Sequence, residues 1–336
     1  MRHPAGNISV IGAGSWGTTL AAVLAEKGHT VTLWAHEREV VEEINTKRTN
    51  SIYLPEAILP AHLKATGDLP EAVAGARYIV SVVPTQYIRT VFSPVQSFIR
   101  SDAVVVSASK GIENETLLTP SAVLRNVLKK PVAVLSGPSF AKEVIAKLPT
   151  AVTLASEDKN TGLLLQELFT TDYFRVYTHD DIIGVEIGGA LKNVIAIASG
   201  ICDGLHLGYD ARAALITRGL SEMARLGAGL KGKELTFSGL SGLGDLVLTC
   251  TGPLSRNYTV GYKLGQGQKL ADIISRTASV AEGVTTTLSA YHLSQKYRID
   301  MPITEQVYLA LYKDKPPAEA VRSLMNRSLK TEFYGY

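Results

Sequence analysis

The strongest constraint on the fold is a glycine-rich turn close to the N-terminus. Gly12, Gly14 and Gly17 follow the apolar residues 8–11 with the spacing G-x-G-x-x-G, and a helix-length segment, 18–27, comes next. In such a unit the first glycine permits the tight turn, the second lets the backbone approach a pyrophosphate, and the third lets helix and strand pack closely. The pattern therefore predicts a βαβ unit that binds a dinucleotide at the N-terminus of its first helix.

The rest of the first half continues this alternation of short apolar runs and helix-length segments. Runs rich in Val, Ile and Ala without polar alternation are typical of strands covered on both faces of a parallel sheet. The predicted strands are residues 8–11, 30–34, 78–82, 103–108, 132–136, 151–155 and 174–177, with a further helix over 116–128. We therefore expect an α/β fold, a Rossmann-type doubly wound and mostly parallel sheet.

Beyond residue 180 the strand pattern disappears and helical periodicity replaces it. The predicted helices are 184–202, 211–226, 284–297, 305–311 and 318–329. A chain of 336 residues is also long enough for two hydrophobic cores. We predict a dinucleotide-binding Rossmann domain over 1–180 and an all-helical substrate-binding and catalytic domain over 181–336.

Charge and cysteine content exclude several classes of function. With 34 Lys and Arg against 31 Asp and Glu, and no basic block, the chain is unlike a nucleic-acid-binding or membrane-surface protein. Cys202 and Cys250 lie far apart and are expected to be buried thiols, and the scattered histidines predict no metal site. With no signal peptide pattern and no long uninterrupted apolar run, we expect a cytoplasmic protein without membrane insertion.

The residues after the second strand bear on the choice of nucleotide. The usual acidic residue is missing from this position, which reads Ala35, His36, Glu37 and Arg38. Glu37 could still bind the ribose hydroxyls in a shifted register, whereas His36 and Arg38 could accommodate a 2′-phosphate. The cofactor is thus NAD or NADP, with NADPH slightly favoured. Tyr53 is either an adenine neighbour or an ordinary half-buried tyrosine.

Two later turns also follow strands, and ligands bind beyond the carboxyl ends of strands in open α/β sheets. Lys110 follows the run 103–108 and could polarise a carbonyl or bind a phosphate, unless it is a solvated surface lysine. Gly137 and Ser139 follow the run 132–136, where Ser139 is a candidate N-cap residue.

Three charged residues of the second half are candidates for the chemistry. Lys192 lies in a mostly apolar helical segment, next to small residues that leave room for a ligand or another backbone. Such a lysine has a lowered pKa and can exchange a proton near neutrality, unless its amine lies in solvent. Asp245 is a turn residue or an active-site carboxylate. Arg256, flanked by Ser255 and Asn257, offers donors suited to a phosphate.

Taken together, these stretches resemble one family. The similarity is carried, in this order, by residues 7–17 (NISVIGAGSWG), 109–111 (SKG), 136–143 (SGPSFAKE), 188–193 (GGALKN), 242–251 (GLGDLVLTCT) and 255–257 (SRN). They resemble the bacterial NAD(P)-dependent sn-glycerol-3-phosphate dehydrogenases from about residue 7 to about residue 327. The resemblance implies reversible reduction of dihydroxyacetone phosphate to sn-glycerol 3-phosphate for phospholipid synthesis, by a homodimer.

The same resemblance implies roles for individual residues. Lys192 would donate and accept the proton. The substrate would be bound by Lys110, Gly137, Ser139, Asp245, Ser255, Arg256 and Asn257. The cofactor would contact Ser15, Trp16, His36, Lys110, Ala141, Arg256, Val280 and Glu282, in addition to Gly12, Gly14, Gly17 and the candidate Tyr53. This chemistry suits the residues, because Lys110 can stabilise negative charge at the reacting oxygen and Asp245 can orient Lys192.

Two other functions compete with this interpretation. A Rossmann domain followed by a helical domain also suits a reductase of another small keto acid or hydroxy acid. A non-catalytic sensor of NAD(H) that binds a partner protein would need the glycine turn but would not need Lys110, Lys192 and Asp245 together.

Overall fold

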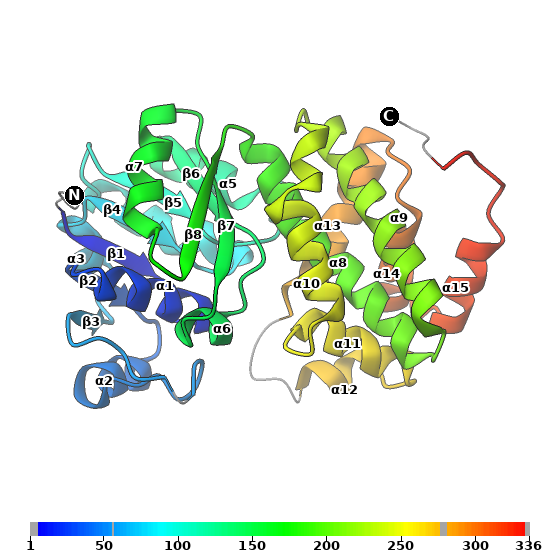
Figure 1. Cartoon of the computed structure of the whole chain (residues 1–336), viewed down its shortest axis with the longest axis horizontal. Helices are drawn as coiled ribbons and strands as arrows, with labels where there is room; N and C mark the ends of the chain where they lie inside the picture. The colour runs from blue at the N-terminus through cyan, green and yellow to red at the C-terminus, as the bar shows by residue number, and fades with distance from the viewer. Residues whose placement is uncertain (1–5, 56, 276–280, 333–336) are drawn as a thin grey trace. The chain divides into compact units, whose positions relative to one another are not determined.

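The computed structural model describes residues 6–55, 57–275 and 281–332. It divides into two compact units, of which the first comprises residues 1–109 and 120–182 and the second residues 110–119 and 183–336 (Figure 1). The division predicted near residue 180 placed residues 110–119 in the first domain. In the structure this segment packs with the second unit instead.

The first unit is built on a sheet of eight strands among the described residues, in the order β3-β2-β1-β4-β5-β6-β7-β8. The strands are β1 (Ile8–Ile11), β2 (Val31–Trp34), β3 (Leu63–Thr66), β4 (Tyr78–Ser81), β5 (Val104–Ser107), β6 (Val132–Ser136), β7 (Thr150–Ala155) and β8 (Phe174–His179). All pairs are parallel except β6 with β7. The expected mostly parallel, Rossmann-type sheet is confirmed.

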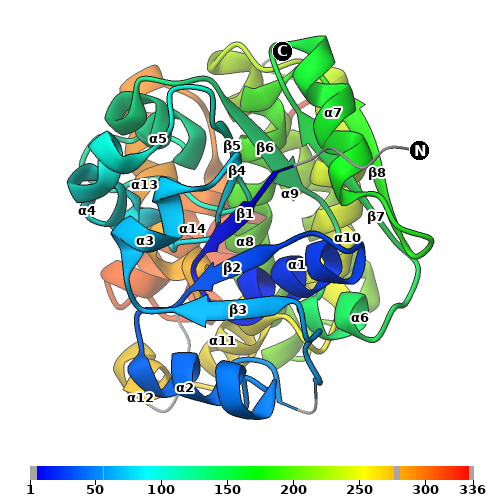
Figure 2. The same ribbon diagram turned by 90° about the vertical axis from the view of Figure 1, so that its left-hand side faces the viewer.

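Helices cover both faces of this sheet. Figure 2 shows α1 (Ser15–Glu26), α6 (Ala141–Ile145) and α7 (Lys159–Phe169) on one face. On the other face lie α3 (Leu69–Ala74), α4 (Ile88–Phe92) and α5 (Pro120–Leu128). The helix α2 (Arg38–Lys47) and the short 3-10 segments Thr85–Tyr87 and Ser93–Phe98 complete the unit. Burial on both faces explains why the central strands β1, β4, β5 and β6 are apolar at all but one position each, which is a serine.

Two elements of this unit differ from the expectation. The strand β3 has only two buried apolar side chains, Leu63 and Ala65, because it lies at the edge of the sheet. Four residues of this composition carry too little pattern to predict a strand. The predicted helix over 116–128 begins only at Pro120, because Leu117 adopts a left-handed conformation (φ 60°) that a helix does not allow.

The second unit is helical. Its helices are α8 (Ile182–Gly204), α9 (Gly208–Gly229), α10 (Asp245–Thr251), α11 (Arg256–Gly265), α12 (Leu270–Ser275), α13 (Glu282–Tyr297), α14 (Pro302–Tyr312) and α15 (Pro317–Met325), with 3-10 and π-helical segments at Glu234–Ser238 and Leu240–Gly244. Among the described residues, α8 is long and apolar enough to cross a membrane, but 89% of its most apolar window is buried inside the protein. Burial in the core of the helical unit accounts for its composition.

Candidate active site

The glycine turn has the geometry of a dinucleotide site. Gly12 has φ 114°, and a Cβ at this position would lie 2.8 Å from the carbonyl oxygen of Val82. A Cβ at Gly17 would lie 1.8 Å from the oxygen of Gly12, whereas one at Gly14 would meet nothing within 4 Å. The first and third glycines thus serve close packing, and the second leaves the backbone open. Because α1 begins directly after it, at Ser15, amide groups and the helix dipole can stabilise a pyrophosphate there.

Trp16, the second residue of α1, is partly buried against the core of the first unit. Its ring lies 6.3 Å from that of Phe174 at an angle of 50°. This packing fixes the tryptophan beside the glycine turn, and its contact with a cofactor stays a prediction.

The residues after β2 leave the choice of nucleotide open. His36 and Arg38 are exposed, and Arg38 donates to Glu42 at 2.7 Å. Glu37 is half-buried and accepts a hydrogen bond of 2.7 Å from the hydroxyl of Tyr53, whose pKa this bond and burial raise to about 12. Tyr53 therefore holds Glu37 in place near the end of β2. The ribose hydroxyls of NAD could bind the Glu37 carboxylate, and the 2′-phosphate of NADP could bind the exposed side chains of His36 and Arg38.

The turn after β6 differs from the prediction in one respect. Gly137 has φ 147°, and a Cβ there would lie 2.9 Å from the Cα of Val152. Ser139 was the candidate N-cap of the next helix, but α6 begins at Ala141 with Phe140 at the cap position and no side-chain cap. The Ser139 hydroxyl instead donates to the Gly137 carbonyl at 3.1 Å, so it braces the turn.

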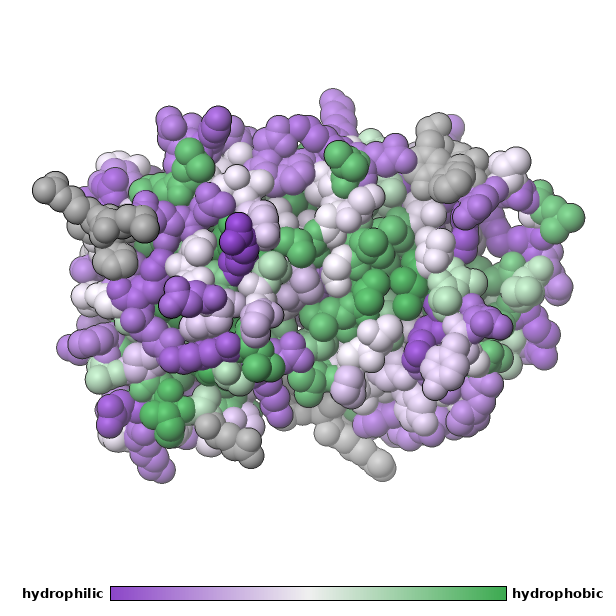
Figure 3. All heavy atoms as spheres, in the orientation of Figure 1, coloured by the Kyte–Doolittle hydropathy of each residue, from purple (hydrophilic) through white to green (hydrophobic). Residues whose placement is uncertain are grey.

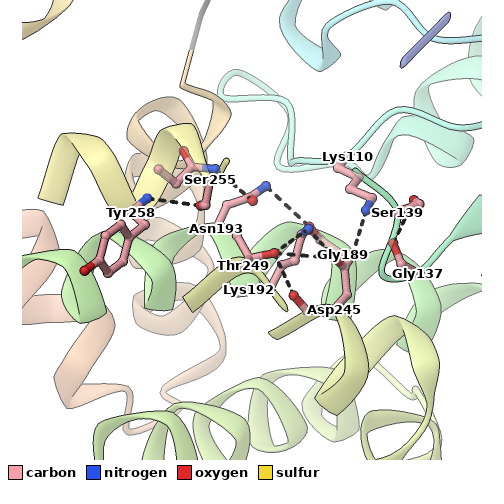
Figure 4. A network of polar contacts seen from close by, with 11 residues as sticks. Lys110, Gly137, Ser139, Gly189, Lys192, Asn193, Asp245, Thr249, Ser255 and Tyr258 are labelled. Carbon is pink, nitrogen blue, oxygen red and sulfur yellow. Dashed lines mark hydrogen bonds and ion pairs between the residues drawn. The ribbon is translucent and has the colours of Figure 1, made fainter. Parts of the chain in front are cut away.

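In the second unit, one carboxylate holds two lysines (Figure 4). The Nζ of Lys110 donates to Oδ2 of Asp245 at 2.6 Å, and the Nζ of Lys192 donates to Oδ1 of the same residue. Lys192 also donates to the Thr249 hydroxyl at 2.8 Å. The side chain of Asp245 is 1% exposed, that of Lys192 9% and that of Lys110 17%. The two lysines predicted from separate motifs are thus brought together, and Lys110 is the more accessible.

Close packing of two helical segments creates this arrangement. A Cβ at Gly188, one turn before Lys192 on α8, would lie 2.5 Å from the carbonyl oxygen of Ser241. The room beside Lys192 is therefore filled by another backbone rather than left for a ligand. The π-helical segment Leu240–Gly244 that makes this contact leads directly into α10, whose first residue is Asp245. Asp245 is accordingly a buried helix-terminal carboxylate facing Lys192.

Burial makes Lys192 a group that can exchange protons. Desolvation lowers its pKa from the ordinary value of 10.5 to about 8, opposed by the charge of Asp245 and reinforced by that of Lys110. Both the ammonium and the amine form are therefore accessible near neutral pH.

Sequence reasoning missed Thr249, which completes the cluster. Its hydroxyl accepts from Lys192 and donates to the Asp245 carbonyl at 2.6 Å. The available signal was the spacing of four residues from Asp245, which places both side chains on one face of a helix.

Ser255, Arg256 and Asn257 have different roles at the start of α11. Ser255 caps the helix by accepting from the amide of Tyr258 at 3.2 Å. Asn257 is buried; its Nδ2 donates to Oδ1 of Asn193 and its Oδ1 accepts from the amide of Gly283, both at 2.9 Å. Asn257 thus joins α8, α11 and α13. Arg256, the first residue of α11, is exposed, so its guanidinium is the group best placed to meet an anion from solution.

One further predicted cofactor residue, Glu282, lies at the start of α13. Glu282 is its first residue, and desolvation raises its pKa against the opposing charges of Lys110, Arg256 and Lys192. Val280 lies outside the described residues. Both cysteines, Cys202 and Cys250, are buried and form no disulfide, as predicted. No group of three or more His, Cys, Asp or Glu side chains in the described part of the chain could hold a metal ion.

Comparison with known proteins assigns both units to one family. The sequence model for the N-terminus of NAD-dependent glycerol-3-phosphate dehydrogenase matches residues 7–162, and that for the C-terminus matches residues 181–322. The chain is 56% identical over 329 residues to the glycerol-3-phosphate dehydrogenase [NAD(P)+] of Geobacter sulfurreducens, covering 97% of this chain and 98% of the relative. The enzyme of the same name from Syntrophotalea carbinolica is 54% identical over 330 residues, covering 97% and 99%.

Solved structures agree with this assignment. Glycerol-3-phosphate dehydrogenase from Coxiella burnetii superposes with a TM-score of 0.93 at 44% identity, covering 96% of this chain and 99% of that one. The Saccharomyces cerevisiae enzyme gives a TM-score of 0.83 at 29% identity, covering 96% and 100%. The chain belongs to the NAD-dependent glycerol-3-phosphate dehydrogenase family.

Proposed function

We propose that the chain interconverts dihydroxyacetone phosphate and sn-glycerol 3-phosphate, with Lys192 as the proton donor in reduction and the proton acceptor in oxidation. The observation that carries this proposal is the buried cluster in which Asp245 binds the ammonium groups of Lys192 and Lys110. The cofactor is NAD or NADP, and the product supplies phospholipid synthesis, the role of this family. In domain terms, the first unit binds the dinucleotide and the helical unit binds the substrate.

The chemistry divides between the cofactor and the chain. Bound NAD(P)H supplies the hydride, and NAD(P)+ accepts it in the reverse direction. As negative charge develops on the carbonyl oxygen, Lys192 delivers a proton to that oxygen and Lys110 stabilises the charge. Asp245 keeps both ammonium groups oriented and favours the charged form of Lys192 before the proton leaves.

Substrate specificity rests on the phosphate. The exposed guanidinium of Arg256 offers forked donors at the N-terminus of α11, a place that itself favours anions. Binding energy from a phosphate that does not react can position the carbonyl for transfer. In the helical unit, Ser255 and Asn257 support this role by fixing the start of α11. Gly137 and Ser139 shape the turn after β6 in the first unit and stay predicted substrate residues.

A spectrophotometric assay of nicotinamide oxidation tests the proposal. We expect turnover with dihydroxyacetone phosphate and kcat/KM values at least a hundredfold lower with unphosphorylated keto acids of similar size. Faster reduction of a keto acid would replace the proposal with the competing reductase function. Tight NADH binding without turnover of any small carbonyl compound would point to a sensor.

The nucleotide preference needs its own measurement. A lower KM for NADPH than for NADH would assign a 2′-phosphate to His36 and Arg38, and the reverse would assign the ribose to Glu37. Arg38→Ala separates the two, because it weakens only a site that reads the 2′-phosphate.

We further propose that the protein acts in the cytoplasm as a homodimer. A cavity of about 690 Å³ lies in the helical unit, lined mostly by apolar side chains of α9, α14 and α15, such as Ala214, Leu215 and Leu324. Figure 3 shows apolar side chains gathered on the face of this unit where α9 is drawn in Figure 1.

Light scattering after size exclusion should give twice the chain mass for the wild-type protein, and the Leu215→Glu variant should give the mass of one chain. A monomer at every concentration would contradict the dimer.

A further inference from the structure

The segment that carries Lys110 has contacts with the helical unit besides the ion pair of Lys110 with Asp245. Ile112 is fully buried in the core of that unit, although the residues on both sides of segment 110–119 belong to the first unit. Ser289, in the middle of α13, is also fully buried, and its hydroxyl lies within hydrogen-bond distance of two groups of the segment. It donates to the carbonyl of Ile112 at 3.0 Å and also contacts Oδ1 of Asn114. Burial of Ile112 in the core of the helical unit and the polar contacts of Ser289 therefore fix the segment on this unit.

The segment is internally braced, so a fixed point in it constrains the whole. The amide of Leu117 donates to the Glu113 carbonyl and the amide of Glu113 donates to the Leu118 carbonyl, both at 2.9 Å. The Thr116 hydroxyl donates to the Glu113 carboxylate. Ile112 lies directly before this braced part and Lys110 lies two residues before Ile112, so the point at which Ser289 holds the backbone is close to Lys110 in the chain.

Ser289 differs from two other buried hydroxyl residues of its helix, Thr287 and Ser294. Thr287 donates to the Gly283 carbonyl and Ser294 to the Tyr291 carbonyl, each at 2.7 Å and each within α13. Such local bonds are the usual choice for helical Ser and Thr. The Ser289 hydroxyl instead reaches across to a segment more than 170 residues away in sequence.

We propose that Ser289 is a positioning residue that holds segment 110–119 on the helical unit and so keeps the Lys110 ammonium on Asp245. The inference rests on the proposed function for its kinetic consequence but not for its geometry. Ser289 touches neither the reacting groups nor Asp245 in the described structure. It acts through the backbone of Ile112, and the bond between Lys110 and Asp245 is the result.

The consequence for catalysis follows from the charges around Lys192. Two charges shift the pKa of Lys192, those of Asp245 on α10 and Lys110 of the segment. Cys250 of α10 and Glu282 of α13 also titrate nearby, and burial raises the pKa of both, so the Cys250 thiol is uncharged near neutral pH. Lys110 is the like charge that lowers the pKa of Lys192. When the segment loosens, this lowering weakens and the pKa of Lys192 rises. Negative charge on the reacting oxygen also loses the stabilisation that Lys110 provides.

The test compares Ser289→Ala with Ser294→Ala, a matched loss of a buried hydroxyl on the same helix. For Ser289→Ala we expect kcat for dihydroxyacetone phosphate reduction to fall about tenfold with an unchanged KM for the nicotinamide cofactor. The pH above which kcat declines should move upward. Ser294→Ala should show neither change. If both variants lose only thermal stability and keep the wild-type kcat and pH profile, Ser289 has a structural role alone and the proposal fails.

A second readout needs no turnover. Competitive labelling of lysine amines with acetic anhydride, read by mass spectrometry, should modify Lys110 severalfold faster in Ser289→Ala than in wild type or Ser294→Ala. Faster labelling of Lys110 in a protein that does not reduce dihydroxyacetone phosphate would refute the proposed function and support the positioning role. Equal labelling rates in all three proteins would overturn the positioning role whatever the enzyme does.

Discussion

Two buried carboxylates of the helical unit, Asp245 and Glu222, show how similar groups serve different ends. Both are almost completely buried. Asp245 binds the ammonium groups of two lysines. Glu222 of α9 accepts from the amides of Ile303 at 2.6 Å and Thr304 at 3.1 Å, which are the second and third residues of α14. One carboxylate therefore faces cations and the other caps a helix.

The difference lies in what the partners can do. Backbone amides are fixed donors that never change charge, so Glu222 links α9 to the start of α14 through partners that do not titrate. Its burial raises its pKa to about 7, against the opposing amide bonds and the charge of Arg225. The partners of Asp245 are lysines, one of which has a pKa of about 8 and can lose its proton. A buried carboxylate thus serves architecture or proton transfer according to its partner.

The contrast between Asp245 and Glu222 depends on proton transfer by Lys192. Lys192→Ala removes the general acid, and we expect kcat to fall by about 10³-fold, within the range for loss of such a group. Cofactor binding, followed by nicotinamide fluorescence, should persist because the glycine turn lies in the first unit. Turnover near the wild-type rate would remove Lys192 from the mechanism.

The next largest effect separates the two carboxylates directly. Asp245→Asn leaves two lysines without their counter-charge, and we expect kcat to fall about 10²-fold. Glu222→Gln should keep the wild-type kcat below its unfolding temperature while its thermal midpoint drops by several degrees, since one amide of α14 loses its acceptor. Equal loss of activity in both variants would show that burial alone, rather than the partner, decides the role.

The sequence predicted what depends on neighbouring residues. The turn from Gly12 to Gly17 follows from spacing between a strand and a helix, and the structure contains both elements. Lys192 and Asp245 were found because each lies in a distinctive local context. The edge strand β3 was missed because an edge strand needs few apolar residues. The prediction that Ser139 caps a helix was wrong because α6 begins at Ala141, so that Phe140 occupies the cap position.

What could not be predicted depends on contacts between distant segments. Lys110 and Asp245 are separated by 135 residues, and no local pattern states that they share an ion pair. Nor does the sequence show that segment 110–119 packs with the helical unit, because its flanking residues lie in the α/β unit. The buried position of Ile112, which decides this, becomes visible only in the folded chain.

A smaller effect is expected where a charge is exposed rather than buried. Arg256→Ala should raise the KM for dihydroxyacetone phosphate at least tenfold and change kcat less, because a charge-assisted contact to a phosphate is lost. Arg322→Ala, which removes an exposed arginine of α15 paired only loosely with Glu319, is the control for lost positive charge and should leave KM unchanged. An unchanged KM in Arg256→Ala would exclude it as the phosphate ligand.

The smallest expected effect concerns the stability of the helical unit and the sign of its pH dependence. The pKa of Glu222 is raised from 4.5 to about 7 on folding, so between these values the folded state binds more protons than the unfolded state. The stability that this protonation contributes is complete below about pH 4.5 and is lost as pH rises through about 7. Across this window the unfolding free energy of the wild type should therefore fall, relative to Glu222→Gln, by about 1 kcal/mol per pH unit.

Urea unfolding of both proteins at pH 5 and pH 7 measures the difference, and Lys192 does not titrate strongly in this range. Parallel stability curves for the two proteins would mean that Glu222 stays ionised at the start of α14, held by its amides as firmly as Asp245 is by its lysines.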